Sequence, residues 1–472
     1  MATSMRTTKE IAERFSLELV GAADVEVSGV SLNTFHLESG ALFIAASGAR
    51  SHGLDYLEIA IDQGAVAVLT DQKEPLGIPS LFHPNPREIA GEVADFVYET
   101  GDSNMLLYGV TGTNGKTSTV FYLRELLSAL GQSAGMISSA FSRVGTATIP
   151  ADLTTPEAPR IHQLLSQMRL EHQFSAAIEA SAQGISRARL KALHFRIAGF
   201  TNLSRDHLDD FQNMDSYLAA KAQLFTPEYA DKAVVFIEDD WAQRLFDQIS
   251  IPKVSIGGDY HFSYQDGQLE ISGRQSLSAQ VSLSNLMAKN LALALVMLLE
   301  DRYTPEKLVR ALDSINLEVP GRLQRVSDAK PAVFIDYAHT PAAVAASARE
   351  LAETFPSLTI VLAASGDRDS GKRAEMAKAA AEYANHIVIT DQHPRSEDPA
   401  VIRQQLIAGL EGYDQYTEVD DPERAIKEAI SHTERSGAVL WCGPGHLKYR
   451  EIKGEKISFD ALALAREALD HD

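Results

Sequence analysis

Short apolar runs alternate with helical spacing in the first part of the chain. GALFIAASG (40–48) and AVAVLTD (65–71) are continuous apolar runs of strand length, which predicts two buried strands. Between them, LDYLEIAIDQG (54–64) has apolar residues at helical spacing and ends in glycine, a common helix stop. Residues 1–103 are therefore predicted to form a small N-terminal α/β domain.

The same alternation continues through the middle of the chain. NMLLYGV (104–110) predicts a strand that enters the turn TGTNGKT (111–117), and STVFYLRELLSALG (118–131) has helical spacing. Strands that alternate with helices favour a parallel sheet, so residues 104–321 are predicted to form a central α/β domain. Its further expected elements are strands at 175–180, 198–203 and 233–239 and a buried helix at 290–303.

A third unit follows the Pro-Gly turn in VPGRLQRV (319–326). Residues 322–472 again alternate strands with helices, which predicts a C-terminal, doubly wound, Rossmann-like domain. The expected strands are 332–338, 358–365, 386–392 and 438–443.

Composition agrees with three domains and narrows the possible partners. The 472 residues are 45% hydrophobic and 23% charged, which is ordinary for folded domains. A net charge of -21 argues against nucleic acid as a partner, although a local basic pocket could still bind a small anion. Cys442 is the only cysteine, so neither an internal disulfide nor a cysteine-based zinc site is possible. LALALVMLL (291–299) is too short to span a membrane, and we expect a cytoplasmic protein with no membrane partner.

The strongest local signal for chemistry is the glycine-rich run between the strand and the helix of the central domain. Glycines let backbone N–H groups approach phosphate oxygens, and the start of a helix adds positive potential. Lys116 can reach the β- and γ-phosphates, and the Thr117 hydroxyl can ligate Mg²⁺. The strict Walker motif has glycine at the position of Val110, so the loop departs from that motif. It predicts a nucleoside triphosphate site and leaves kinase, hydrolase and ligase open; its residues are Gly112, Thr113, Asn114, Gly115, Lys116 and Thr117.

A set of motifs in order along the chain resembles the Mur ligase family. The resemblance covers nearly the whole chain, and the motifs are specific when taken together although several are weak alone. It implies an ATP-dependent amide ligase, most similar to members that add the third amino acid to the UDP-muramoyl-peptide precursor of the bacterial cell wall. The motifs are GVTGTNGKTS (109–118), TTPEAP (154–159), EAS (179–181), TNLSRDHLD (201–209), AAKAQLF (219–225), PGR (320–322), DYAHTP (336–341), SGDRDSGKR (365–373), DQHPRSEDP (391–399) and GPGH (443–446).

The resemblance implies a catalytic set around the phosphates. A substrate carboxylate would attack the γ-phosphate, and an amine would then attack the acyl phosphate, with Lys116 neutralising charge. Thr117 and Glu179 would hold Mg²⁺, and His207 matches the second-metal histidine. Lys221 matches a lysine that is carbamylated in the family. Without the resemblance, each of these residues has a simpler interpretation. Glu179 would be a solvent-facing carboxylate at the end of a strand, His207 a structural histidine, and Lys221 a lysine on a helix surface.

The third domain is expected to complete the nucleotide site. Arg322, Asp336 and His339 resemble family residues that contact ATP from this side. Asn290 resembles the adenine-side asparagine, but the usual second asparagine is replaced by Met287.

The resemblance also implies a site for UDP-MurNAc-dipeptide. Threonine hydroxyls and an arginine are sensible partners for its phosphates and carboxylates. The family often has histidine at Gln183 and serine at Ala182, and Asn33-Thr34-Phe35 replaces its usual Asp-Ser-Arg in the first domain. The predicted substrate residues are Thr154, Thr155, Ser181 and Arg189.

The incoming amino acid is predicted to meet arginines of the third domain, which pair well with carboxylates. Diaminopimelate enzymes commonly read Asp-Asn-Pro-Arg and Gly-x-Gly-His-Glu, whereas this chain has Gln392-His393-Pro394-Arg395 and Leu447. Loss of these polar partners favours L-lysine or a related diamino acid, while retention of the arginine favours diaminopimelate. The predicted contacts are Arg368, Asp391, His393, Arg395 and Gly443.

Three alternatives stay open at this point. The enzyme could perform the same reaction with meso-diaminopimelate or another amino acid. It could be a non-catalytic nucleotide-binding regulator, which the full set of catalytic residues disfavours. A folylpolyglutamate-type ligase shares the central fold but lacks the same flanking motifs. We expect a monomer.

Overall fold

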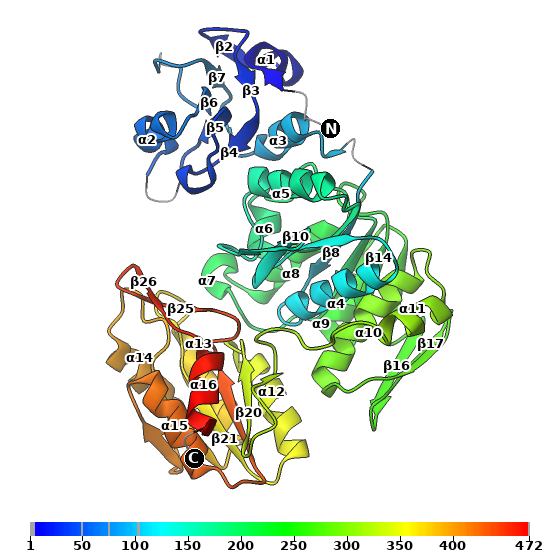
Figure 1. The fold of residues 1–472 in the computed structure, drawn as a ribbon, viewed down its shortest axis with the longest axis vertical. Helices are drawn as coiled ribbons and strands as arrows, with labels where there is room; N and C mark the ends of the chain where they lie inside the picture. Colours follow the sequence, from blue (N-terminus) through cyan, green and yellow to red (C-terminus); the bar gives the residue numbers. More distant parts are fainter. Residues whose placement is uncertain (1–4, 49–50, 74–75, 102–103, 471–472) are drawn as a thin grey trace.

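The computed structural model describes residues 5–48, 51–73, 76–101 and 104–470. Three α/β domains follow one another along the long axis of the molecule, in chain order (Figure 1). This confirms the predicted fold class. The expected boundary after residue 103 lies partly outside the described residues. Among the helices that are described, none is long and apolar enough to cross a bilayer.

The N-terminal domain is built on a five-stranded sheet in the order β2-β7-β6-β5-β4. Both predicted strands are present, as β5 (Ala41–Ala45) and β6 (Ala67–Thr70), and they pair in parallel because both are fully buried. The predicted helix is a short 3-10 turn, η2 (Gly53–Tyr56), followed by α2 (Leu57–Asp62). The other elements are β1 (Arg6–Thr7), α1 (Thr8–Phe15), β2 (Glu18–Val20), β3 (Glu26–Val27), β4 (Gly29–Ser31), η1 (Thr34–His36), β7 (Ser80–Phe82) and α3 (Ala90–Tyr98).

The central domain contains an eleven-stranded sheet whose middle is parallel. The predicted strands are confirmed as β8 (Leu106–Thr111), β12 (Ser175–Glu179), β13 (Ile197–Phe200) and β14 (Ala233–Phe236). The remaining strands are β9 (Ala134–Ile137), β10 (Phe141–Val144), β11 (Ala147–Pro150), β15 (Lys253–Ile256), β16 (Tyr260–Gln265), β17 (Gln268–Gly273) and β18 (Leu277–Gln280).

Helices cover both faces of this sheet (Figure 1). Helix α4 (Lys116–Ala129) follows the glycine-rich loop, and the buried helix predicted at 290–303 is α10 (Asn285–Leu299). These two helices pack against each other over one hydrophobic core. The others are α5 (Ala158–Leu170), α6 (Ala182–Ser186), α7 (Leu208–Phe211), α8 (Met214–Ala222), η4 (Gln223–Phe225), α9 (Asp240–Gln248) and α11 (Pro305–Leu312).

The C-terminal domain has a six-stranded sheet in the order β19-β20-β24-β21-β22-β23, parallel except at β19. The four predicted strands are β20 (Ala332–Asp336), β21 (Leu358–Leu362), β22 (His386–Ile389) and β24 (Ala438–Cys442). The other elements are β19 (Gln324–Arg325), α12 (Pro341–Thr354), α13 (Gly371–Ala381), α14 (Pro399–Ile407), η5 (Ala408–Leu410), β23 (Tyr416–Glu418), α15 (Pro422–His432), β25 (Tyr449–Ile452), β26 (Glu455–Ser458) and α16 (Ala461–Asp470).

Parallel strands carry the loops of the site at their carboxyl ends. In the central domain β8, β12 and β13 are neighbours, so residues 111–117, 179–181 and 201–207 meet at one edge. Ligands of open α/β sheets bind at this edge.

Candidate active site

The glycine-rich loop is packed too closely for side chains at two positions. Gly112 has φ 146° and Gly115 has φ 83°, both in the region that favours glycine. A Cβ on Gly112 would lie 1.8 Å from Oγ1 of Thr201, and one on Gly115 would lie 2.2 Å from Oδ1 of Asn290. The predicted adenine-side asparagine therefore lies directly against the loop.

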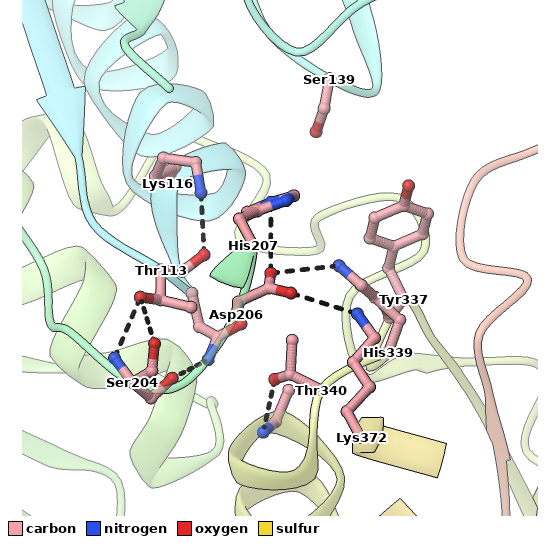
Figure 2. Close-up of polar contacts among 12 residues, drawn as sticks. Thr113, Lys116, Ser139, Ser204, Asp206, His207, Tyr337, His339, Thr340 and Lys372 are labelled. Carbon is pink, nitrogen blue, oxygen red and sulfur yellow. Dashed lines mark hydrogen bonds and ion pairs between the residues drawn. The ribbon is translucent and has the colours of Figure 1, made fainter. Parts of the chain in front are cut away.

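The segment after β13 holds the loop in shape. The Asn114 backbone N–H donates to Oδ1 of Asn202 at 3.0 Å, and Thr201 Oγ1 donates to the Asn114 carbonyl at 2.6 Å. The Thr113 hydroxyl bonds to backbone groups of Ser204 (Figure 2). These contacts hold the loop in one conformation, which lowers the conformational entropy that is lost when the loop binds a phosphate.

Two lysines converge on the loop. Lys116 Nζ donates to the carbonyls of Gly112 and Thr113 at 3.0 and 2.8 Å. Lys221, from α8, is 1% exposed, and its Nζ donates to the same Gly112 carbonyl at 2.7 Å and lies 4.3 Å from the ring centroid of Tyr217. Burial, and then the charge of Lys116, hold the pKa of Lys221 well below its usual value.

Glu179 presents a free carboxylate oxygen beside the start of α4. The residue ends β12 and is 1% exposed. The backbone N–H and hydroxyl of Ser139 donate to Oε1 at 3.1 and 3.3 Å, while Oε2 has no hydrogen-bond partner among the described residues. The Thr117 hydroxyl lies 3.0 Å from the Ser139 hydroxyl. A buried, unpartnered carboxylate oxygen near a threonine hydroxyl fits a hard cation such as Mg²⁺.

The protein supplies few groups to such a cation. Within the described part of the chain, no three His, Cys, Asp or Glu side chains gather closely enough to hold a metal ion by themselves. Mg²⁺ is commonly held by one or two carboxylates together with substrate phosphates and water.

Asp206 connects the central and C-terminal domains. It is 3% exposed and lies 3.3 Å from His207 Nε2, 3.1 Å from Lys372 Nζ and 3.9 Å from His339 Nε2. Figure 2 shows the carboxylate between these three groups, of which two come from the C-terminal domain. Burial acts to raise the pKa of Asp206, but the three groups outweigh it and hold the pKa below its usual range.

Three further residues of the C-terminal domain were predicted to contact the nucleotide, namely Arg322, Asp336 and His339. Arg322 Nη2 donates to the Thr117 hydroxyl at 2.9 Å, and its guanidinium lies 4.4 Å from the ring centroid of Tyr337. Asp336 accepts backbone N–H bonds from residues 323 and 338 at 2.6 and 2.8 Å, and burial raises its pKa. Burial lowers the pKa of His339 to about 4, so this imidazole is neutral at pH 7.

The predicted dipeptide residues form one bonded cluster. The buried hydroxyl of Thr155 lies 3.0 Å from the Ser181 hydroxyl, which caps α6. Arg189 donates to the Thr155 carbonyl at 3.1 Å and pairs with Glu157 at 3.0 Å. Thr154 beside them is half-buried. Gln183, where the family often has histidine, lies 2.9 Å from His207 Nδ1.

The unusual Asn33-Thr34-Phe35 run faces the central domain. Asn33 caps η1, and Phe35 is 92% exposed. The next residue, His36, lies 2.7 Å from the carboxylate of Asp152, just before the TTPEAP motif. The run thus lies near the predicted dipeptide residues.

The predicted amino-acid residues meet around the loop that follows β22. The Gly366 backbone N–H donates to the His393 carbonyl at 2.8 Å, which brings the loop with the exposed Arg368 close. A Cβ on Gly443 would lie 2.0 Å from Oε1 of the residue at 392. Asp391 instead accepts from Arg403 at 2.5 Å, so contact with a substrate would require it to leave this arginine.

Several residues of the site were absent from the sequence predictions. Ser139, Arg403 and Glu451 contact the predicted residues Glu179, Asp391 and Arg395, and Lys372 pairs with Asp206 beside the predicted His207. Lys372 belongs to the SGDRDSGKR motif, which was a usable signal. The other three lie outside the recognised motifs, so only their spatial contacts identify them.

Models of the family match each of the three domains. The Mur ligase family, catalytic domain matches residues 26–96, the Mur ligase middle domain matches residues 110–293, and the Mur ligase, glutamate ligase domain matches residues 321–445. A UDP-N-acetylmuramyl-tripeptide synthetase of Leifsonia xyli subsp. xyli is 41% identical, over 98% of this chain and 96% of the relative. The chain belongs to the Mur ligase family. Mur ligases are ATP-dependent, ADP-forming amide ligases, so this protein is such an enzyme.

Two further relatives extend the comparison. A UDP-N-acetylmuramoyl-L-alanyl-D-glutamate–2,6-diaminopimelate ligase of Syntrophomonas wolfei subsp. wolfei is 34% identical, over 98% of each chain. A solved structure of a ligase with the same printed activity has a TM-score of 0.66 and 26% identity, covering 99% of each chain. The Mur ligase fold therefore extends over all three domains of this chain.

Burial of His393 leads to a prediction for stability. This residue is 7% exposed, and burial lowers its pKa to about 4, with the charges of Arg395 and Arg450 acting in the same direction. Its Nδ1 accepts the backbone N–H of Glu451 at 2.9 Å, which requires an unprotonated nitrogen. Between pH 6.5 and 4 the unfolded state therefore binds a proton that the folded state does not, so the free energy of unfolding falls as pH falls.

We expect acidification from pH 7 to pH 4 to cost the wild type roughly 2 kcal/mol more than a His393→Gln variant, whose side chain cannot titrate. Urea unfolding of both proteins at several pH values measures the difference. Equal pH dependence of the two proteins would mean that folding does not lower the pKa of His393 and would contradict the prediction.

Proposed function

We propose that this Mur ligase joins an amino acid with a side-chain amine, L-lysine in preference, to the D-glutamate of UDP-MurNAc-L-Ala-D-Glu, consuming ATP. The observation that carries the proposal is the buried, unpartnered Oε2 of Glu179 beside Thr117 and the nucleotide loop. The relatives support the third-residue step, because their printed names describe a tripeptide synthetase and a diaminopimelate ligase.

The reaction needs positive charge where phosphate oxygens gather. In the proposal, the glutamate side-chain carboxylate attacks the γ-phosphorus, the bond to the β-phosphate oxygen breaks, and ADP leaves. Lys116 swings from the loop carbonyls to the phosphoryl oxygens, and Arg322 approaches from the C-terminal domain. The amine of the incoming amino acid then attacks the acyl carbon, and phosphate and a proton are released.

A divalent cation would be held by Thr117 and Glu179, with His207 at a second metal position. Mg²⁺ there would neutralise charge on the transferring phosphoryl group. His207 is turned toward Asp206 at 3.3 Å and toward Gln183 at 2.9 Å. Burial lowers the pKa of His207, which favours the neutral imidazole that a metal needs.

Lys221 is proposed to carry a carbamate. Its lowered pKa leaves a fraction of neutral amine, whose lone pair can attack CO₂ and lose a proton to give a carbamate anion. The negative carbamate would take the place of the positive Lys221 ammonium, and repulsion from the Lys116 ammonium would become attraction. The new group would lie next to the Gly112 carbonyl, at the phosphate end of the loop.

The choice of amino acid depends on residues 391–395 and 447. Leu447 offers no charge to the distal end of the amino acid, and the neutral His393 offers no positive charge to a second carboxylate, which diaminopimelate carries and L-lysine lacks. The same reaction with meso-diaminopimelate is the second candidate, because Arg395 is retained and a relative is named for that substrate. The remaining expectations, that the enzyme is a cytoplasmic monomer without nucleic-acid or membrane partners, stay predictions.

Product mass spectrometry tests the proposal directly. Purified enzyme is incubated with ATP, Mg²⁺ and UDP-MurNAc-L-Ala-D-Glu together with L-lysine, L-ornithine, meso-diaminopimelate or L-alanine. We expect a UDP-tripeptide with L-lysine, and ADP release only when both acceptor and amino acid are present. ADP release that ignores the UDP-dipeptide would contradict the proposal, and the absence of turnover with every amino acid would favour a non-catalytic nucleotide-binding protein.

A further inference from the structure

The hairpin formed by β25 and β26 is fastened to the loop that carries Arg395. The Arg395 N–H donates to the carbonyl of Glu451 at 3.1 Å, and the Lys453 N–H donates to the carbonyl of Arg395 at 2.7 Å. Arg395 has φ 53°, a left-handed conformation that these backbone bonds on both sides help to hold. These backbone bonds therefore fix the position of Arg395 relative to the hairpin.

The same contact brings opposite charges together. Nε of Arg395 lies 3.2 Å from Oε2 of Glu451, and the two side chains are 23% and 34% exposed. The hairpin thus places the carboxylate of Glu451 against Arg395, the arginine that is proposed to contact the incoming amino acid.

Two other carboxylates near Arg395 are paired with other arginines. Glu397 receives both terminal nitrogens of Arg373 at 2.8 Å, and Asp391 receives Arg403. Glu451 is the carboxylate that lies in ion-pair contact with Arg395.

A second arginine nearby has no such partner. Arg368 is exposed, and its side chain forms no hydrogen bond or ion pair with any residue that the structure describes. The loop that carries it is bonded to the loop of Arg395 through the Gly366–His393 backbone bond at 2.8 Å. One unpaired cation and one neutralised cation therefore lie on adjoining loops.

We propose that Glu451 sets the specificity of the proposed ligation by neutralising Arg395, so that the enzyme accepts amino acids with one carboxylate and rejects those with two. This inference rests on the proposed function. Arg368 is left to receive the α-carboxylate by charge-assisted pairing. A second carboxylate at Arg395 would either displace Glu451 or lie beside it, and like charges in a partly buried site repel.

Glu451→Gln tests the idea, because it removes the charge and keeps the shape. The measurement is kcat/KM for L-lysine and for meso-diaminopimelate with UDP-MurNAc-L-Ala-D-Glu. We expect the ratio of meso-diaminopimelate to L-lysine to rise at least about tenfold, since Arg395 becomes available to a second carboxylate. Glu455→Gln, an exposed position on β26 of the same hairpin, is the matched control and should leave the ratio unchanged.

A double variant separates a charge effect from a change in hairpin structure. If Glu451 acts through Arg395, Glu451→Gln combined with Arg395→Gln should lose the gain for meso-diaminopimelate. An unchanged ratio in Glu451→Gln, or a gain that survives in the double variant, would overturn the inference while leaving the ligase function intact. A wild type that uses meso-diaminopimelate better than L-lysine would also overturn it. A wild type that joins no amino acid to the UDP-dipeptide would instead overturn the proposed function, and this inference with it.

Discussion

Replacing Lys116 with alanine is expected to lower kcat for ligation by about a thousandfold or more, because a cation that can reach the transferred phosphoryl oxygens is among the largest catalytic contributions. The fold should survive. Lys116 Nζ bonds only to the carbonyls of Gly112 and Thr113, while the loop is held independently by Thr201 and Asn202.

Two measurements are needed for this variant. ADP release in the presence of UDP-dipeptide and amino acid reports activity, and thermal unfolding reports the fold. Lys307→Ala, which removes an exposed lysine from α11 in the same domain, is the control and should match the wild type in both. Turnover of Lys116→Ala within a few fold of the wild type would contradict the proposed phosphate site.

Lys221→Arg is expected to lower kcat by roughly a hundredfold or more, since arginine keeps the positive charge but cannot form a carbamate. The arginine side chain is also larger than a site with 1% exposure accommodates without strain. Activity alone therefore does not separate loss of the modification from misplacement.

Carbamylation has a direct readout. Wild-type protein in ¹³C-bicarbonate should show a carbamate carbonyl resonance that Lys221→Arg lacks. Lys232→Arg is a matched control that should keep the resonance, because Lys232 is half-buried in the same domain and its amine is paired with Glu300 at 3.1 Å. A wild type that is active and shows no such resonance would contradict the carbamate role.

Strands fully buried in parallel sheets were the most predictable elements. β8, β12, β21 and β24 are almost completely buried and lie in largely apolar runs, because both of their faces are covered by helices. One strand missed by the sequence analysis is β16, at the antiparallel end of the eleven-stranded sheet, in which exposed residues such as His261 and Ser263 alternate with buried or half-buried ones. Such strands bury one face at most and leave no continuous apolar run.

The loops of the candidate site were predicted to different degrees. Gly112 and Gly115 were recognised because their backbone must lie close to phosphate, and the structure shows the same closeness to Thr201 and Asn290. Asp391 was expected to face the amino acid, but its carboxylate is bonded to Arg403, a residue of α14 that no local pattern singled out. A side chain's partner depends on which helix packs beside it.

The sequence by itself determined the three α/β domains, ten buried strands within them and the position of the nucleotide loop. These follow from local periodicity and from the backbone freedom of glycine, which act over a few residues. Only the tertiary structure decided which charges meet. Asp206 and Lys372 are 166 residues apart, and Arg395 and Glu451 come from a loop and a hairpin strand of one domain. Ion pairs between such distant positions depend on how domains and hairpins pack, because electrostatic attraction falls steeply with distance and solvent exposure.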